Sequence, residues 1–110
     1  MANTFKNEQV QNVTTGWSDV GTELNNTTQR TIIGMTIANT TSAVIAVDVV
    51  IYNNSTTRTY LVKAAPIPTG GSLIVVGGDQ KVVLDYQDLV QVQSNTATSA
   101  DVVMSLLDIT

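Results

Sequence analysis

The sequence predicts a single all-β domain, an antiparallel β-sandwich of the jelly-roll or immunoglobulin-like Greek-key kind with a polar N-terminal arm. Short runs of alternating apolar and polar residues recur along the chain, separated by clusters of Asn, Asp, Gly and Pro. Seventeen Thr and abundant Val and Ile, with few Lys, Glu and Arg, favour strands over exposed helices. At 110 residues the chain is long enough for one hydrophobic core.

The N-terminal segment differs in composition from the rest. Residues 1–16 are rich in Asn, Thr and Gln, and they carry only Phe5, Val10 and Val13 as apolar anchors. This pattern predicts an arm or a loose first strand, followed by the sandwich over residues 17–110. Within that domain, residues 17–24 could form a short strand that Gly21 weakens.

The two most apolar runs predict central strands. Residues 30–39 alternate so that Ile33, Met35 and Ile37 are expected on one face, with Ile32 on the other. In residues 43–52 we expect one face to carry Ile45, Val47, Val49 and Ile51, while the other carries Val44, Ala46, Asp48, Val50 and Tyr52. The second run is apolar enough to be partly covered on both sides.

The second half of the chain continues the pattern. Residues 56–65 read as a strand with one face toward solvent, and residues 66–71 (PIPTGG) predict a crossover or a loop because Pro cannot donate to a ladder. Three short runs and a C-terminal strand follow, at residues 72–76, 80–84, 88–93 and 100–109. Jelly-roll and immunoglobulin-like strand orders remain open at this point.

Composition excludes several function classes. A net charge of −4 and a pI near 4.3 leave no cluster of Lys and Arg to hold nucleic acid. Without Cys or His the chain has no disulfide, no thiolate site and no imidazole base. Neither an apolar signal region nor a membrane-length apolar stretch is present, so we expect synthesis in the cytoplasm and no membrane partner.

Asp79, Asp85 and Asp88 are the candidates for a calcium site because carboxylate oxygens are preferred Ca²⁺ ligands and the three lie on neighbouring loops. They lack the Asp-x-Asp-x-Asp spacing and a bidentate Glu. Asp is also a common turn former that accepts hydrogen bonds from nearby backbone N–H groups. We therefore favour the turn interpretation and expect no metal and no cofactor.

Catalysis is not indicated by any pattern. Asp19 with Glu23, or Asp48 with Asp101, could be named as carboxylate pairs, but their spacing does not select them. A hydroxyl nucleophile would need a base, and apart from carboxylates only the three lysines could serve, at positions 6, 63 and 81. We expect a protein that is not an enzyme.

Aromatic residues are the candidates for contacts with a partner. Tyr52 and Tyr60 are expected to pack along strands, whereas Trp17 could be a contact anchor or a lid over one end of the sandwich. The predicted partner-contact residues are Phe5, Val10, Val13 and Trp17.

Several segments together carry a family likeness: MANTFK at the start, IIGMTIANTTSAVIAVDVVI, TYLVKAAPIPTGGSLIVVGGDQKVVLDYQD, and SADVVMSLLDIT at the end. The chain resembles the small virion structural proteins of tailed phages of marine bacteria and cyanobacteria, over nearly its whole length. The ordered combination of residues 63–68, 78–84 and 100–109 is the most specific part. Residues 23–26 (ELNN) depart from the Pro- or Ala-rich turn that we expect of such proteins.

The resemblance implies a component of the virion, such as a capsid decoration protein or a head, neck or tail accessory. The first hypothesis is a homo-oligomeric decoration or cement protein on the major capsid lattice, with residues 1–16 reaching a neighbouring subunit. The alternative is a tail, neck or fibre module that binds another tail protein, or a host surface glycan through residues such as Trp17, Asp79 and Tyr86.

Overall fold

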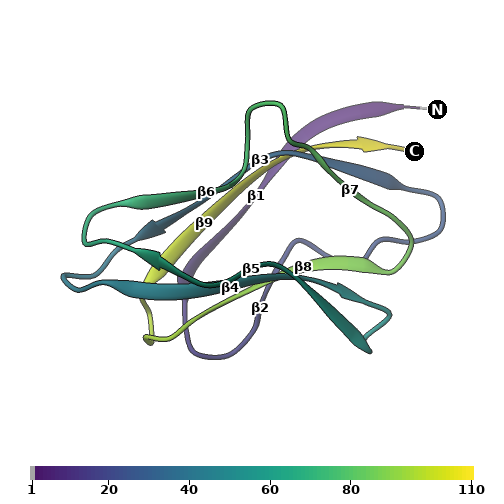
Figure 1. Cartoon of the computed structure of the whole chain (residues 1–110). Helices are drawn as coiled ribbons and strands as arrows, with labels where there is room; N and C mark the ends of the chain where they lie inside the picture. Colours follow the sequence, from purple (N-terminus) through teal and green to yellow (C-terminus); the bar gives the residue numbers. More distant parts are fainter. Residues whose placement is uncertain (1) are drawn as a thin grey trace.

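The computed structural model describes residues 2–110, which fold into two antiparallel sheets packed face to face (Figure 1). The nine strands are β1 (Asn3–Val13), β2 (Ser18–Val20), β3 (Gln29–Asn39), β4 (Ile45–Asn53), β5 (Thr57–Ile67), β6 (Ser72–Val76), β7 (Val82–Leu84), β8 (Asp88–Ser94) and β9 (Ala100–Ile109). The all-β prediction is therefore confirmed, and the architecture is consistent with the predicted sandwich. Residues 2–110 contain no helix long and apolar enough to cross a bilayer.

The strand order is that of a jelly roll. Sheet A has the order β1-β9-β3-β6, with β7 pairing β3 beyond the end of β6, and sheet B has the order β2-β8-β4-β5. The first two strands lie in different sheets, unlike those of an immunoglobulin domain. Strand pairs β4/β5, β3/β6, β2/β8 and β1/β9 form one long hairpin that is rolled into two layers.

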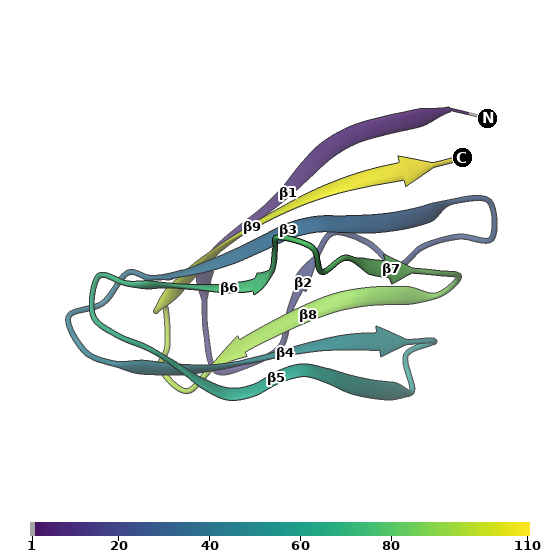
Figure 2. The same cartoon turned by 45° about the horizontal axis from the view of Figure 1, so that its top comes forward.

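Strand β1 occupies most of the segment for which we expected an arm or a loose first strand. Its residues pair with β9 from Asn3 opposite Ile109 to Val10 opposite Val102, and again at Val13 opposite Ala100. The backbones of Ala2 and Thr110 donate hydrogen bonds to each other, so these two residues lie side by side, at the ends of β1 and β9 that Figure 2 shows next to each other. β1 is thus an edge strand of sheet A.

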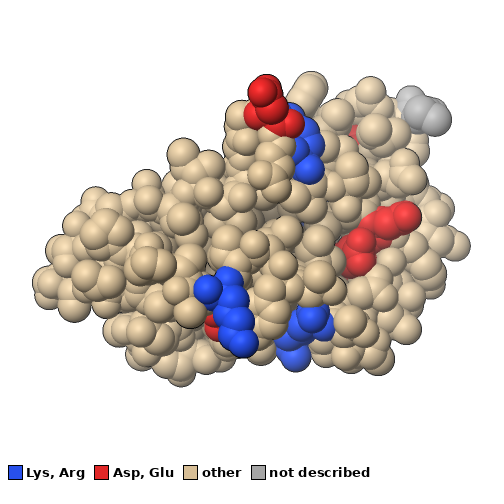
Figure 3. All heavy atoms as spheres, in the orientation of Figure 1, with Lys and Arg blue, Asp and Glu red and all other residues tan. Residues whose placement is uncertain are grey.

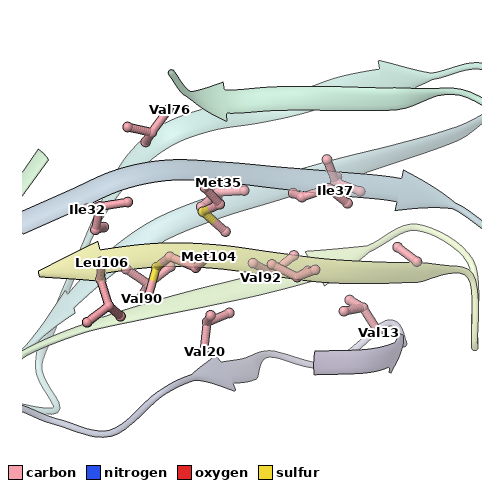
Figure 4. Close-up of a cluster of buried hydrophobic side chains, with 14 of the residues drawn as sticks. Val13, Val20, Ile32, Met35, Ile37, Val76, Val90, Val92, Met104 and Leu106 are labelled. Atoms are coloured by element: carbon pink, nitrogen blue, oxygen red, sulfur yellow. The ribbon is translucent and has the colours of Figure 1, made fainter. Parts of the chain in front are cut away.

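The core lies between the inner faces of the two sheets. Its fully buried side chains come from nearly every strand and include Val13, Val20, Ile32, Met35, Ile37, Val90, Val92, Met104 and Leu106 (Figure 4). They are branched aliphatic residues and methionines without polar atoms, which is the composition expected of a dry inter-sheet layer.

A β-bulge in β3 corrects the predicted facing of one strand. The ladder with β9 shifts between Ile32 and Gly34, so Ile33 is an extra residue without a direct partner. The extra residue reverses the alternation locally, because two residues of β3 oppose one of β9. As a result Ile32, not Ile33, shares the core face with Met35 and Ile37.

Strand β4 follows its predicted alternation, since Ile45, Val47 and Val49 are fully buried on the inner face. The prediction that Pro66 cannot lie in a ladder was wrong: β5 continues to Ile67, and Pro66 pairs with Ala46. Among residues 2–110 no strand lies on the outer side of β5, so a residue without an N–H costs no ladder bond there. The turn to β6 then starts after Ile67.

Candidate interaction surfaces

The four predicted contact residues have different environments. Phe5 is 75% exposed on β1, Val10 is half-buried, and Trp17 is half-buried just before β2. Val13 is completely buried in the core, so its side chain is not available to a partner. The structure does not bring the four residues into one cluster: Phe5 lies on the outer side of sheet A, while Trp17 packs on the outer side of sheet B.

The outer face of sheet A is the most apolar exposed surface of the sandwich. The ladders place Phe5, Leu107, Thr31 and Val83 in one row across β1, β9, β3 and β7. A second row crosses β1, β9, β3 and β6 with Gln9, Val103, Thr36 and Ile74. Four side chains in these rows are large, apolar and exposed, at 75% for Phe5, 69% for Ile74, 63% for Val83 and 48% for Val103. We call this surface outer face A.

Outer face A carries no charge between its two apolar rows. The row between them consists of Asn7, Ser105 and Gly34, and the end row contains Asn3, Ile109 and Gln29. Charged side chains are also few on the side of the molecule drawn in Figure 3, where most of the surface is uncharged. Asp101, opposite Ala38, lies on the same side of β9 beyond the second row. The uncharged area between the rows, with its exposed aliphatic and aromatic groups, loses little on desolvation, which suits it to contact with another protein.

The outer face of sheet B carries a compact aromatic and cationic cluster. The Arg58 guanidinium carbon lies 4.2 Å from the centre of the Tyr52 ring and 5.0 Å from that of Trp17. Trp17 in turn meets Tyr60 edge to face, with ring centres 6.4 Å apart. Arg58 Nε also donates to Gln91 Oε1 at 3.1 Å. These contacts are favourable cation–π and edge-to-face geometries.

This cluster explains why Val50 is fully buried although it points away from the core. Val50 is opposite both Tyr60 on β5 and Gln91 on β8. Gln91 is held from the other side because its Nε2 donates to Asp19 Oδ1 at 2.8 Å. Trp17 therefore packs over part of the outer face of sheet B, and Arg58 covers its ring.

The residues named for glycan binding are not brought together. Asp79 lies in the turn between β6 and β7 of sheet A, whereas Trp17 packs on the outer face of sheet B. Tyr86 is exposed in the turn before β8, where its carbonyl accepts a hydrogen bond from Asn53 Nδ2 at 3.3 Å. A stacking site for a sugar needs an open ring face, and Arg58 occupies one face of Trp17.

The carboxylates considered for calcium or catalysis form local structural bonds. Asp88 Oδ2 accepts from the Asp85 N–H at 2.9 Å, and Asp85 Oδ1 accepts from the Tyr86 N–H at the same distance. Asp48 lies in sheet B, where Oδ1 accepts from the Ala64 N–H at 2.7 Å, and Asp101 lies in sheet A. Among residues 2–110, no group of three or more potential ligands gathers closely enough to hold a metal ion.

Sequence reasoning did not single out Arg58, Ile74, Val83 or Val103. A signal for the last three was present, because Val103 alternates with buried residues of β9 and the same alternation covers β6 and β7. No sequence signal identifies Arg58, since its ring partners come from β4 and from the segment before β2.

No protein-family profile matches the sequence, and no curated protein matches it either. Solved structures that are similar over almost the whole chain include the following two. One is a chain from the acidic stable capsid structure of Helicobacter pylori bacteriophage KHP30, at 9% identity and a TM-score of 0.59, covering 99% of this chain and 89% of that one. The other comes from Bacillus endospore appendages, a family of disulfide-linked pili, at 15% identity and a TM-score of 0.52, covering 98% and 88%. At these identities the similarity shows that the fold is shared.

Proposed function

We propose that the chain is a non-enzymatic structural protein of a phage virion that decorates or cements the major capsid lattice through outer face A. The observation that carries the proposal is the neutral face on which Phe5, Ile74, Val83 and Val103 are exposed. Four strands hold these side chains at fixed spacing, so the face presents a rigid surface to a repeating lattice.

The fold is compatible with this proposal but also occurs in proteins with other functions. Jelly rolls occur in viral capsid proteins, but also in lectins and in enzymes of the cupin type. The similar chain from the phage KHP30 capsid places one protein of this fold in a virion structure. The resemblance of the sequence to small virion proteins points in the same direction, and together they favour the virion over the other uses of the fold.

The first experiment is cryo-EM of particles of the phage that encodes the chain. Repeated density for the sandwich on the icosahedral shell, with outer face A against the major capsid protein, is the expected result. Density confined to the neck, tail or fibre would replace decoration by the accessory or receptor-binding alternative. Absence of the chain from particles would contradict both.

A matched pair of substitutions tests which surface makes the contact. Val83 on outer face A and Val44 in the turn after β3 are both 63% exposed. Val83→Asp should reduce binding to particles stripped of the protein, because the contact would bury an unpaired carboxylate. Val44→Asp should bind normally, and both variants should remain folded. Loss of binding by Val44→Asp alone would indicate that the contact is made by the turn after β3 and not by outer face A.

A further inference from the structure

Strand β1 is the long open edge of the sandwich. Within residues 2–110 the other outer strands are short or blunted: β2 and β7 have three residues each, β6 has five, and β5 contains Pro66 and a bulge at Ala64 with φ +51°. β1 has eleven residues and no Pro, and within residues 2–110 no strand lies on its outer side. Its own bulge, with Asn12 at φ +59°, comes after Val10, so the stretch from Asn3 to Val10 is regular. Natural proteins usually block such an edge unless another strand covers it.

The free backbone groups of β1 can be assigned from its pairing with β9. Ala2 and Thr110 exchange both of their N–H···O bonds, each 3.0 Å long. Bonded and non-bonded pairs alternate along an antiparallel ladder, so the next bonded residues are Thr4, Lys6, Glu8 and Val10. Phe5, Asn7 and Gln9 therefore direct their N–H and C=O groups away from β9, toward the open edge. These groups suit another antiparallel strand.

The charges of β1 are self-complementary about Asn7. Lys6 and Glu8 lie on the face of the strand that is directed toward sheet B, opposite Leu106 and Met104, one on each side of Asn7. Two copies of β1 related by a two-fold axis at Asn7 place Lys6 of each copy opposite Glu8 of the other. An axis at Lys6 or at Glu8 would place like charges opposite each other, which destabilises a strand pair. The axis at Asn7 also leaves every outward backbone group of Phe5, Asn7 and Gln9 with a partner.

We propose that β1 binds β1 of a second copy of this chain, antiparallel and centred on Asn7. Sheet A then continues through both subunits, and the axis, perpendicular to the sheet, leaves both copies of outer face A on the same side. The dimer would double the area of outer face A that is offered to a partner. The pairing does not depend on a role in the virion, because it involves the purified chain alone.

Single cysteines test the register in a chain that has none of its own. In the proposed dimer, residue 7 faces its own copy with Cα atoms about 5.5 Å apart, within disulfide range. Asn7→Cys should therefore give a disulfide-linked dimer on mild oxidation. Asn3→Cys is the matched control, an exposed position on the same strand that lies roughly 26 Å from its copy at 3.3 Å per residue. No linked dimer with Asn7→Cys, or equal linkage at both positions, would overturn the proposal.

Charge reversal provides an independent test by sedimentation velocity. Lys6→Glu and Glu8→Lys each make both cross-strand pairs repulsive, so each variant alone should dimerise roughly tenfold more weakly than the original chain. An equal mixture of the two variants should recover the dimer, because every pair is then of opposite charge. Thermal unfolding controls for the fold, since Lys6 Nζ also lies 4.0 Å from Asp108. A monomeric original chain, open filaments, or no recovery in the mixture would contradict the two-fold pairing.

Discussion

At the scale of single residues, one ion pair joins the central strands of sheet A on the side that faces the core. Arg30 is opposite Asp108, and its Nε and Nη2 donate to the two carboxylate oxygens at 2.7 and 3.0 Å. The hydrogen bond from Arg30 lowers the pKa of Asp108; burial opposes this shift, while the charges of Arg30 and Lys6 reinforce it. Because both side chains are largely buried, loss of Asp108 removes the carboxylate to which Arg30 is bonded, whereas loss of Arg30 leaves Asp108 only the more distant ammonium of Lys6 at 4.0 Å.

The ion pair leads to a prediction with a pH dependence. Asp108→Asn should lower the free energy of unfolding by about 3 kcal/mol at neutral pH, since a buried guanidinium loses its counter-charge. The folded pKa lies below the ordinary value of 3.8, so the contribution is complete above that value and is lost as pH falls through the folded pKa. Chemical denaturation of both proteins from pH 7 to pH 2 should show the difference shrinking in the acid range. If the difference in unfolding free energy between the two proteins did not change with pH, the contribution could not come from the ionised carboxylate of Asp108.

Asn39 is another buried polar residue, and its side chain forms hydrogen bonds with backbone groups of two segments. Its Nδ2 donates to the carbonyls of Ala43 and Ile67 at 2.7 and 3.0 Å, and its Oδ1 accepts from the Thr41 N–H at 2.8 Å. The side chain thus ties the turn after β3 to the end of β5 in the other sheet.

Asn39→Ala should therefore cost about 2 kcal/mol in the free energy of unfolding, because the buried carbonyl of Ile67 loses this donor. Asn26→Ala, at an exposed position in the loop between β2 and β3, is the control and should change stability by less than about 0.5 kcal/mol. Urea denaturation measures both. Equal effects would show that the bonds of Asn39 are not important for stability.

At the scale of elements, bulges determine which residues reach the core. β3 has one where Ile33 is inserted, and β5 has another near Ala64, whose N–H is bonded by Asp48. The bulge in β3 brings Ile32 onto the buried face, while Ile33 is only half-buried. Simple alternation cannot predict this because one extra residue exchanges the two faces of the strand.

Two adjacent isoleucines test the bulge directly. Ile32→Ala should destabilise the protein by about 3 kcal/mol, since it removes a fully buried side chain and leaves a cavity. Ile33→Ala should cost about 1 kcal/mol, because its side chain is already partly in water. Thermal or urea unfolding gives both values. A larger destabilisation by Ile33→Ala than by Ile32→Ala would indicate that Ile33 is the residue on the core face, as simple alternation predicts.

At the scale of the whole molecule, the strand order joins the two ends of the chain. β1 and β9 lie side by side, and Val13 at the end of β1 closes the core beside Ala100 (Figures 1 and 4). The extents of the sandwich, 45 × 29 × 21 Å, leave a thin core to which each long strand contributes.

Removal of β1 should therefore affect the whole domain. Deletion of residues 2–13 exposes the edge of β9 and the apolar side chains that Val10 and Val13 cover. We expect the truncated chain to unfold at lower temperature or to aggregate, as measured by circular dichroism melting and light scattering. A truncated chain that melts like the full one would show that residues 17–110 fold independently.

The sequence by itself determined the all-β class, the positions of most strands and the alternation that buries Val47 and Val49, since these follow from local periodicity. Only the tertiary structure decided the jelly-roll order, the facing of Ile32, and the place of Trp17 against Arg58 and Tyr60. Strand order depends on pairings between distant segments, which periodicity does not encode. Outer face A likewise exists only because β1, β9, β3, β6 and β7 become neighbours in space.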